Sequence, residues 1–301
     1  MDRQASGTPK TLGKTLGKTL GKVGIIAGGG DLPLKLAESC RSSGIDFHVI
    51  GINGWAGPEI EVFPHDRIGL GQVGRALSLL KDQACQSVVI AGYVKRPDFS
   101  KLKLDMGGAK ILPKVIAAAR KGDDALLGVL VETFEAKGFV VVGAEAIFAG
   151  LLADDGAYGA LLPDDLAKSD IIRATELVGA ISPYDVGQGA VVCEGLVLAV
   201  EAAEGTDAML ERVAALPEAI RGTPERRRGV LVKTPKTGQE KRVDLPTIGL
   251  RTVELAAEAG LAGIAIAAGA ALVLDREDLV AKADAAGLFI LGFDAASEIG
   301  E

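Results

Sequence analysis

Residues 23–44, VGIIAGGGDLPLKLAESCRSSG, contain the strand–turn–helix unit from which the predicted fold is built. The apolar run of residues 23–27 predicts a short buried strand, and an amphipathic pattern that stops at Gly44 predicts a helix. The three glycines before Asp31 resemble the first turn of a nucleotide-binding domain, where backbone amides approach phosphates. Their spacing is not GxGxxG, so the dinucleotide fingerprint is not met. We interpret the turn as a phosphate or sugar contact, or simply as a tight turn.

The chain up to residue 150 continues this alternation of strands and helices. Further strands are expected at 46–52, 87–91 and 139–142, and helices at 72–85, 109–120 and 124–137. Strands that alternate with helices are typical of a parallel sheet covered on both faces. We therefore predict an α/β protein whose N-terminal domain, residues 23–150, is a Rossmann-like doubly wound parallel sheet.

The second half mixes helical crossovers with hairpin connections. Strands are expected at 190–200, 230–232, near 244, 262–267, 271–274 and 288–291, and helices at 164–181, 206–216, 251–259 and 276–286. We predict a linker at 151–163 and a C-terminal mixed α/β catalytic domain at 164–295. Residues 1–22 contain TLGK three times in succession, and this low-complexity segment predicts a disordered tail.

Composition limits the classes of function. The 301 residues are 48% hydrophobic and 4% aromatic with a net charge of −7, which argues against a general nucleic-acid binder. The three cysteines are far apart and only two histidines are present, so few residues are available for a zinc site or a Ser-His-Asp triad. A catalytic metal would be held by carboxylates, which favours magnesium or manganese. No run reaches about 18 apolar residues, so no membrane span is predicted.

The stretch 229–249, GVLVKTPKTGQEKRVDLPTIG, is the main candidate for chemistry. It predicts a strand, then a loop with several cations, then Asp244 just before a helix. Cations and a carboxylate at strand ends and helix starts suit a phosphorylated substrate and a metal. The cations are Lys233, Lys236, Lys241 and Arg242. A solvated basic hairpin with a turn-forming aspartate is the alternative.

Three other loops carry candidate groups. The loop after the strand at 87–91 contains Lys95, either an anion contact or part of a surface basic pair. The helix near 124 begins with two acids, which either cap the helix or contribute to a ligand site at the rim of the sheet. The turn after Val200 brings together Glu201, Thr206 and Asp207, and capping of the next helix is again the alternative.

Six long motifs resemble one family and occur in its order. They are IIAGGGDLP (25–33), VVIAGYVKRP (88–97), GDDALL (122–127), SPYDVGQGAVV (182–192), EAAEGTDAML (201–210) and VLVKTPKTGQEKRVDLPTIG (230–249). The chain thereby resembles the LpxI-type UDP-2,3-diacylglucosamine pyrophosphatases over residues 23 to about 294. No single motif is specific, but six long motifs in one order are.

The resemblance implies a reaction and a central residue. The expected reaction of lipid A biosynthesis hydrolyses UDP-2,3-diacylglucosamine to UMP and 2,3-diacylglucosamine 1-phosphate (lipid X). The ligand is expected between two domains, and a divalent metal such as Mg²⁺ or Mn²⁺ is expected to be required. In the family the acid of a D-x-P-x-[IV]-G segment is essential, and Asp244 occupies that position. The family often has Gln-Asp where this chain has Gln239-Glu240, a conservative departure.

We predict roles for individual residues from these motifs. The resemblance implies a catalytic role for Asp244, and catalytic roles are expected for Lys233 and Arg242 because attack on a pyrophosphate gathers negative charge that cations stabilise. Metal ligation is expected for Asp244 with one or more of Glu201, Asp207 and Asp124, and the metal would orient the attacking water. The predicted substrate-binding residues are Gly29, Gly30, Asp31, Tyr93, Val94, Lys95, Asp124, Gly187, Gln188, Thr206, Asp207, Lys236, Gln239 and Thr247.

The implied substrate also sets the expected surroundings. Acyl chains need an apolar surface, and access to a lipid in a bilayer implies a cytoplasmic protein in peripheral contact with the inner membrane. The two-domain layout permits a homodimer. One rival interpretation is a nucleotide-cofactor oxidoreductase that uses the glycine turn. A second is a non-catalytic module that binds a nucleotide sugar or a lipid phosphate.

Overall fold

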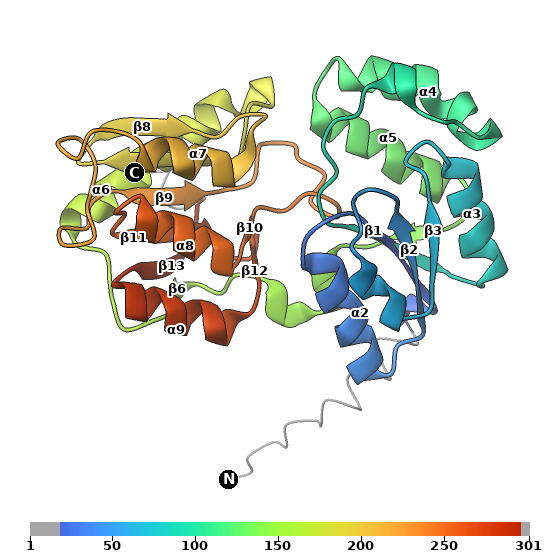
Figure 1. Cartoon of the computed structure of the whole chain (residues 1–301), viewed down its shortest axis with the longest axis horizontal. Helices are drawn as coiled ribbons and strands as arrows, with labels where there is room; N and C mark the ends of the chain where they lie inside the picture. Colours follow the sequence, from blue (N-terminus) through green and yellow to red (C-terminus); the bar gives the residue numbers. More distant parts are fainter. Residues whose placement is uncertain (1–18, 296–301) are drawn as a thin grey trace, which may run out of the picture. The chain divides into compact units, whose positions relative to one another are not determined.

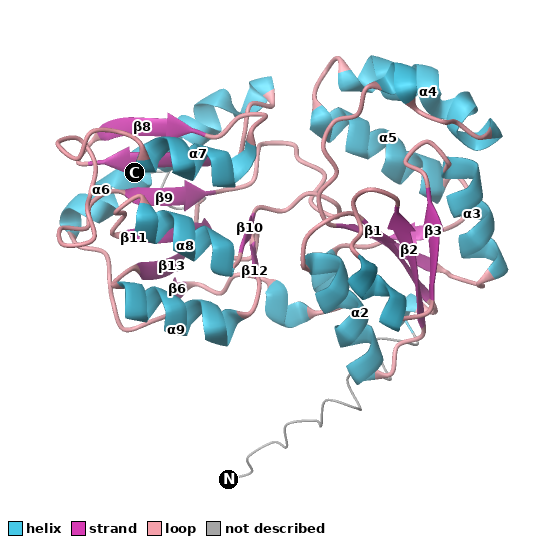
Figure 2. Ribbon diagram, viewed as in Figure 1, coloured by secondary structure: helices cyan, strands magenta, loops and turns pink. Residues whose placement is uncertain are grey.

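The computed structural model describes residues 19–295, which form two compact units that meet in sequence at Ala149 and Gly150 (Figures 1 and 2). Most of the predicted tail, residues 1–18, lies outside the described residues. Leu20 is described and buried, and its carbonyl oxygen accepts a hydrogen bond from Ser87 Oγ at 2.6 Å. Contacts with the first unit therefore begin before Val23.

The first unit is built on a parallel sheet with strand order β3-β2-β1-β4-β5. Its strands are β1 (Val23–Ala27), β2 (Phe47–Ile52), β3 (His65–Ile68), β4 (Ser87–Ala91) and β5 (Val140–Val141). Its helices are α2 (Leu32–Ser43), α3 (Val73–Asp82), α4 (Met106–Ala119) and α5 (Asp123–Glu135). The central strand β1 is buried along its whole length, as expected for a strand covered on both faces. The chain runs from β1 outward to β2 and β3 and then returns to β4 on the other side of β1, so the strand order reverses at β1, the position at which sheets of this kind bind ligands at their carboxyl ends.

The sequence prediction for the first unit lacks one strand. No strand was predicted between the strand at 46–52 and the helix at 72–85, but β3 lies there and pairs with β2 at the edge of the sheet. Three of its four residues are only half-buried, and the fourth, Ile68, is buried. An edge strand with a polar sequence shows neither the apolar run nor the alternation that identifies a strand. The predicted strand at 139–142 is shorter in the structure, where β5 spans Val140–Val141.

The second unit contains a six-stranded mixed sheet with order β6-β13-β11-β9-β7-β8 and a small parallel sheet of β10 and β12. The strands are β6 (Gly156–Ala157), β7 (Gly189–Cys193), β8 (Leu196–Val200), β9 (Val230–Lys233), β10 (Thr247–Ile248), β11 (Gly263–Ala267), β12 (Leu272–Val273) and β13 (Phe289–Phe293). The helices are α6 (Asp165–Ile181), α7 (Gly205–Ala214), α8 (Leu250–Glu258) and α9 (Arg276–Ala286). The α/β class, with a parallel first sheet and a mixed second sheet, is confirmed.

The six-stranded sheet has an apolar core on each face. Residues of α7, α8 and α9 pack on one face, where these helices lie along the front of the sheet in Figure 1, and α6 packs on the other. The alternation of side chains along β9 divides it between the two cores: Val230 and Val232 face α6, whereas Leu231 faces α7 and α8. The same alternation directs Lys233, the last residue of β9, toward the face that carries α7.

The predicted single strand at 190–200 is wrong. The structure has an antiparallel hairpin, in which β7 and β8 are joined at Glu194 and Gly195. Both turn residues have positive φ (49° and 80°), the conformation that suits a two-residue hairpin turn. Asp170, buried on α6, accepts hydrogen bonds from both turn amides at 2.8 and 2.7 Å. This distant carboxylate, which no local pattern reveals, stabilises the turn.

The expected second strand near residue 244 is also absent from the described fold. Turns connect β9 to β10, with the Val243 and Asp244 amides donating to the Glu240 carbonyl at 3.1 and 3.2 Å. The strand begins only at Thr247, after Pro246. Asp244 therefore lies on a loop, and its position depends on side-chain contacts rather than on a strand ladder.

Two further predictions concern the cysteines and the possibility of a membrane span. The three cysteines are buried and free, and burial raises the pKa of each thiol, to about 12 for Cys40, so these thiols stay protonated. None of the helices in residues 19–295 combines the length and the apolar composition needed to cross a bilayer.

Candidate functional site

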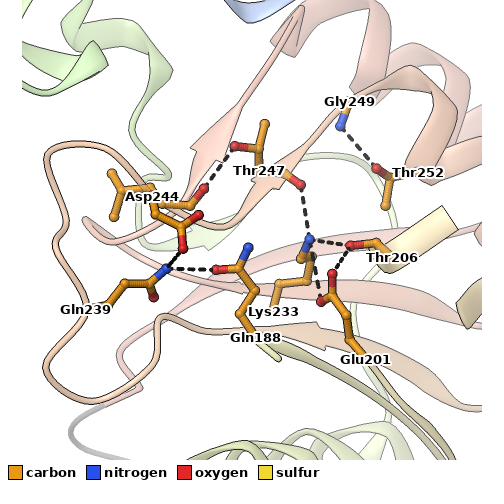
Figure 3. Close-up of polar contacts among 10 residues, drawn as sticks. Gln188, Glu201, Thr206, Lys233, Gln239, Asp244, Thr247, Gly249 and Thr252 are labelled. Atoms are coloured by element: carbon orange, nitrogen blue, oxygen red, sulfur yellow. Dashed lines mark hydrogen bonds and ion pairs between the residues drawn. The ribbon is translucent and has the colours of Figure 1, made fainter. Parts of the chain in front are cut away.

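Sheet register brings together residues that are far apart in the sequence. Lys233 at the end of β9 pairs with Gly189 at the start of β7. The amide of Glu201, which directly follows β8, donates to the Gly189 carbonyl at 2.9 Å. The carboxyl ends of β8 and β9 therefore meet the loop that enters β7. This meeting point carries polar side chains from each of these segments (Figure 3).

The buried Lys233 and Glu201 form a polar network there with the half-buried Thr206 (Figure 3). Lys233 is 3% exposed and Glu201 6% exposed. Lys233 Nζ donates to Thr206 Oγ1 at 2.6 Å and lies 3.9 Å from Glu201 Oε2, while Thr206 Oγ1 donates to Glu201 Oε1 at 2.8 Å. An uncompensated charge in such a place costs several kcal/mol, so the lysine and the glutamate depend on each other. Thr206 lies inside α7 and does not cap it, which excludes the capping interpretation for this residue.

A side-chain amide orients Asp244. Gln239 is buried, and its Nε2 donates to Asp244 Oδ2 and, at 3.2 Å, to Gln188 Oε1 (Figure 3). The other end of the same amide accepts from the Lys236 backbone at 2.8 Å. Because Gln239 is neutral, this contact orients the carboxylate without cancelling its charge.

The network around Lys233 is linked to the loop of Asp244 through β10. Lys233 Nζ also donates to the Thr247 carbonyl at 3.4 Å, three residues after Asp244 (Figure 3). Thr247 Oγ1 in turn donates to the Leu245 carbonyl at 3.1 Å. The lysine thus contacts both the start of α7 and the strand that follows Asp244.

Three of the four cations of the stretch 229–249 form ion pairs within the unit. Besides Lys233, Lys236 forms an ion pair with Asp185, and Arg242 forms one with Glu240 at 2.7 Å. Hydrogen bonds from Arg242 keep the pKa of Glu240 below its ordinary value. The alternative of a solvated basic hairpin does not hold for Lys233 and Lys236, whose side chains are 4% and 11% exposed. Lys241 is exposed.

The predicted metal ligands do not form a ready-made metal site. In the part of the chain that the structure describes, no group of three or more His, Cys, Asp or Glu is placed to hold a metal ion. Glu201 Oε1 accepts from Thr206 and Lys233 Nζ lies 3.9 Å from Oε2, but the buried Oε2 has no hydrogen-bond partner, so this oxygen stays available as a ligand. Asp207 is exposed on the first turn of α7. Asp244 fits a magnesium site only if substrate phosphates supply further oxygens, as they do in many Mg²⁺ enzymes.

Glycines allow the close approach of the loop that enters β7. A Cβ on Gly187 would lie 2.1 Å from the Glu201 carbonyl oxygen, and a Cβ on Gly189 would lie 2.6 Å from Glu201 Oε2. Backbone cannot move aside as a flexible side chain can, so only glycine fits at position 187. These two residues therefore shape the site by packing. The neighbouring Gln188 supplies the amide oxygen described above.

In the first unit the structure groups some of the predicted residues at the end of β1. Gly29 and Tyr93 exchange two backbone hydrogen bonds of 2.9 and 3.0 Å, and the Tyr93 ring covers Gly29 and Gly30. A Cβ on Gly28 would lie 2.7 Å from the Tyr93 carbonyl, so close packing of β1 on β4 explains that glycine. Asp31 precedes α2 without capping it.

The remaining predicted residues of the first unit lie on loops. Val94 is half-buried and Lys95 exposed, in the loop that follows β4. Asp124 is half-buried in the first turn of α5, beside Asp123. An ion pair of 3.7 Å between Arg96 and Asp123 joins the β4 loop to the start of α5. Neither acid caps this helix, because the N-cap position is occupied by Gly122, which has no side chain to cap it.

Sequence reasoning missed two residues that anchor the Asp244 loop. Asp185 has a positive φ of 53° and binds Lys236, and the Ser182 hydroxyl accepts a hydrogen bond from the Thr237 backbone. The signal that could have identified them is weak. Both lie in the SPYDVGQG turn, whose short polar residues are typical of turns in general.

The sequence is similar to one family over most of its length. The profile of the LpxI N-terminal domain matches residues 22–151, and the profile of the LpxI C-terminal domain matches residues 154–291. The chain is also 51% identical over 272 residues to the UDP-2,3-diacylglucosamine pyrophosphatase LpxI of Caulobacter vibrioides. That alignment covers 90% of this chain and 97% of the relative.

Proposed function

This chain belongs to the LpxI family, and from that premise we propose that it hydrolyses the pyrophosphate bond of UDP-2,3-diacylglucosamine. The observation that carries the proposal is the 51% identity to a relative named for this reaction, across 97% of that relative. The expected products are UMP and 2,3-diacylglucosamine 1-phosphate, in lipid A biosynthesis. The enzyme is then a hydrolase of a phosphoric anhydride.

Asp244 is the proposed catalytic carboxylate. It combines a loop position with an orientation imposed by the Gln239 amide, and preorganised groups of this kind contribute through positioning and electrostatics. Arg242, whose side chain is 38% exposed, is the proposed cation for charge that develops on the phosphates. Lys233 is better suited to a positioning role than to substrate contact, because it is 3% exposed and bonded within the unit.

Dependence on a divalent metal is part of the proposal. Asp244 would hold Mg²⁺ (or Mn²⁺) together with phosphate oxygens of the substrate, which agrees with the lack of an acidic cluster in residues 19–295. When bound, the metal would neutralise phosphate charge and lower the pKa of a coordinated water. The protein's own contribution is to orient Asp244 through Gln239.

We further propose that residues of both units contact the substrate. The glycine turn with Asp31 and Tyr93 in the first unit would bind one part of it, and the Asp244 loop of the second unit would act on the pyrophosphate. The acyl chains of the substrate lead us to propose a cytoplasmic protein in peripheral contact with the inner membrane.

The test is release of UMP from UDP-2,3-diacylglucosamine by the intact protein, with and without Mg²⁺, compared with Asp244→Ala. We expect metal-dependent release that falls by at least about 100-fold in the variant, the size typical for loss of a group that takes part in the chemistry. Asp165→Ala is the matched control, since the Asp165 side chain is fully exposed on α6 of the same unit. It is expected to retain normal turnover.

Two results would contradict the proposal. Near-normal turnover by Asp244→Ala would show that Asp244 is not the catalytic residue. No UMP with any divalent metal, combined with tight binding of the nucleotide sugar, would favour the non-catalytic binding module instead.

A further inference from the structure

The segment of residues 101–121, KLKLDMGGAKILPKVIAAARK, exposes charge of one sign only. Its exposed residues, which we call the α4 surface, include no acid and six cations: Lys101, Lys103, Lys110, Lys114, Arg120 and Lys121. Lys101 pairs with Asp98 at 3.3 Å, whereas the other five cations form no ion pair with a residue that the structure describes. A solvated surface usually mixes both signs. In a chain with a net charge of −7, this local excess of cations indicates an anionic partner.

The one acid of the segment does not offset these cations, because it holds two helices together. Asp105 Oδ1 accepts from the Gly108 and Gly74 amides at 2.7 and 3.1 Å, and Oδ2 accepts from the Arg75 amide at 2.7 Å. The carboxylate thus caps α4 and also binds the first amides of α3, where helix dipoles favour a negative charge. A Cβ on Gly107 would lie 2.4 Å from the Gly74 Cα, so the two helix starts are packed tightly. The beginning of α4 is therefore fixed in place.

Apolar side chains lie between the cations on the outer side of α4. At 3.6 residues per turn, the exposed residues of the helix share one side: Met106, Ala109, Lys110, Pro113, Lys114 and Ala117. Met106 is 79% exposed, and Leu104, just before the helix, is 37% exposed. The helix packs on α5 and α3, and Figure 1 shows α5 between α4 and the strands of the first unit. The surface thus combines lysines with uncovered aliphatic groups.

This combination favours a lipid surface over other anionic partners. Helices that lie in a membrane interface pair basic residues with apolar side chains that enter the headgroup region. Clusters of four to eight Lys or Arg residues bind anionic lipids, and lysine stems can lie along the apolar boundary while their ammonium groups stay in water. Single-stranded nucleic acids are bound with the help of aromatic side chains, and the exposed residues of this segment include none.

We propose that the α4 surface docks the protein on a bilayer that contains anionic lipids. Met106 and Leu104 enter the headgroup region, and Lys110 and Lys114 contact lipid phosphates on either side. The inference rests on the proposed function in one respect, since a substrate with acyl chains resides in a membrane. It names the surface of the protein that makes this contact.

Flotation of the intact protein with lipid vesicles is the first test. Vesicles of phosphatidylcholine with about one-third phosphatidylglycerol should bind the protein, and pure phosphatidylcholine should bind it much more weakly. The binding should weaken as salt is raised, because exposed charges are screened. Absence of binding to the anionic vesicles at low salt would overturn the proposal.

Charge reversal on α4 identifies the surface. Lys110→Glu/Lys114→Glu is expected to weaken vesicle binding by at least about 20-fold, since each lysine near an anionic surface strengthens binding about five-fold. Lys168→Glu/Arg173→Glu is the matched control, because it makes the same change in net charge at exposed positions of α6. It should bind nearly as the wild type does. The lysines of residues 1–22 are present in all of these proteins, so they do not cause a difference between the variants. Equal binding by the two variants would overturn the proposal.

A fluorescent label tests insertion of the apolar side chains. Met106→Cys, labelled with an environment-sensitive fluorophore, should show a blue shift and stronger emission with the anionic vesicles. The three native cysteines are buried and should not react. Leu166→Cys is the matched control on α6, where Leu166 is 58% exposed, and its label should not respond. A dimer in solution that dissociates in Met106→Asp would assign the surface to a second copy of the chain and overturn the proposal.

Kinetics separate this proposal from the proposed reaction. Lys110→Glu/Lys114→Glu should hydrolyse UDP-2,3-diacylglucosamine in detergent micelles with kcat within about two-fold of the wild type, and should be at least about ten-fold slower on substrate in anionic vesicles. Vesicle binding through α4 without any hydrolysis would support the surface and overturn the reaction. Hydrolysis in vesicles that is equally fast in the variant would overturn the surface and leave the reaction standing.

Discussion

At the scale of single residues, the ion pair of Lys233 and Glu201 is the feature with the clearest energetic consequence. Both groups are nearly inaccessible to water, and Thr206 is bonded to each of them. A buried pair is weak support for stability as such, but removal of one partner leaves an uncompensated charge. The main effect of this pair is therefore to hold Thr206 and the Thr247 carbonyl in position.

Lys233→Met is expected to lower the free energy of unfolding by about 3–5 kcal/mol, because Glu201 would remain buried without its cation. The double variant Lys233→Met/Glu201→Gln should recover part of this loss, which makes the two changes non-additive. Urea unfolding of the two single variants and the double variant measures the coupling. Additive losses would show that the pair does not interact.

Activity distinguishes positioning from stability in the same variants. If Lys233 positions the Asp244 loop through Thr247, the double variant should stay folded yet show a reduced kcat. A double variant with wild-type kcat would restrict the pair to a structural role.

At the scale of elements, the β7–β8 hairpin decides how the site is assembled. Its register sets Glu201 beside Gly189, and β7 pairs with β9 so that Lys233 also reaches Gly189. The turn at Glu194 and Gly195 lies at the other end of these strands. A change in the turn therefore tests the hairpin without touching the site.

Gly195→Ala is expected to destabilise the protein by about 1–2 kcal/mol, since Gly195 has a φ of 80° and an alanine in the left-handed region is strained. Gly179→Ala is the matched comparison in α6 of the same unit, where an added Cβ meets no atom within 4 Å. That variant should be more stable by about 0.5–1 kcal/mol. Thermal or urea unfolding measures both, and KM is expected to stay unchanged. A stabilised Gly195→Ala protein would contradict the turn geometry.

At the scale of the whole molecule, each of the two units is a candidate for independent folding. Each has its own sheet, and the second has apolar cores on both faces of its six-stranded sheet. Domains with their own core can in principle fold alone. The profile matches of the two LpxI domains divide the chain at nearly the same place, between residues 151 and 154.

A fragment of residues 150–295 is therefore expected to fold without the first unit. Far-UV circular dichroism and a single cooperative urea transition would show this. A fragment of residues 164–295 is the control, because it lacks β6, which pairs with β13, and the buried Ala153. It is expected to unfold at lower urea. A non-cooperative transition in the longer fragment would contradict the independence of the unit.

Much of the fold could be predicted because its signals are local. The run of apolar residues in β1, the left-handed Gly44 at the end of α2 and the apolar periodicity of α8 each act within a few residues. These patterns predicted the α/β class, most helices and the parallel first sheet. The failures were β3, an edge strand without an apolar pattern, the strand expected near residue 244, where turns lead into β10, and the β7–β8 turn, which depends on Asp170 in another element.

The sequence by itself determined the class of fold, the family and the position of Asp244 in its motif. Only the tertiary structure decided that Glu201 meets Lys233 and not a cluster of acids, and that Gln239 holds Asp244. The physical reason is that strand pairing and burial act between residues that are distant in sequence. A carboxylate on a loop can bind a metal, cap a helix or neutralise a lysine, and its neighbours in space determine which of these it does.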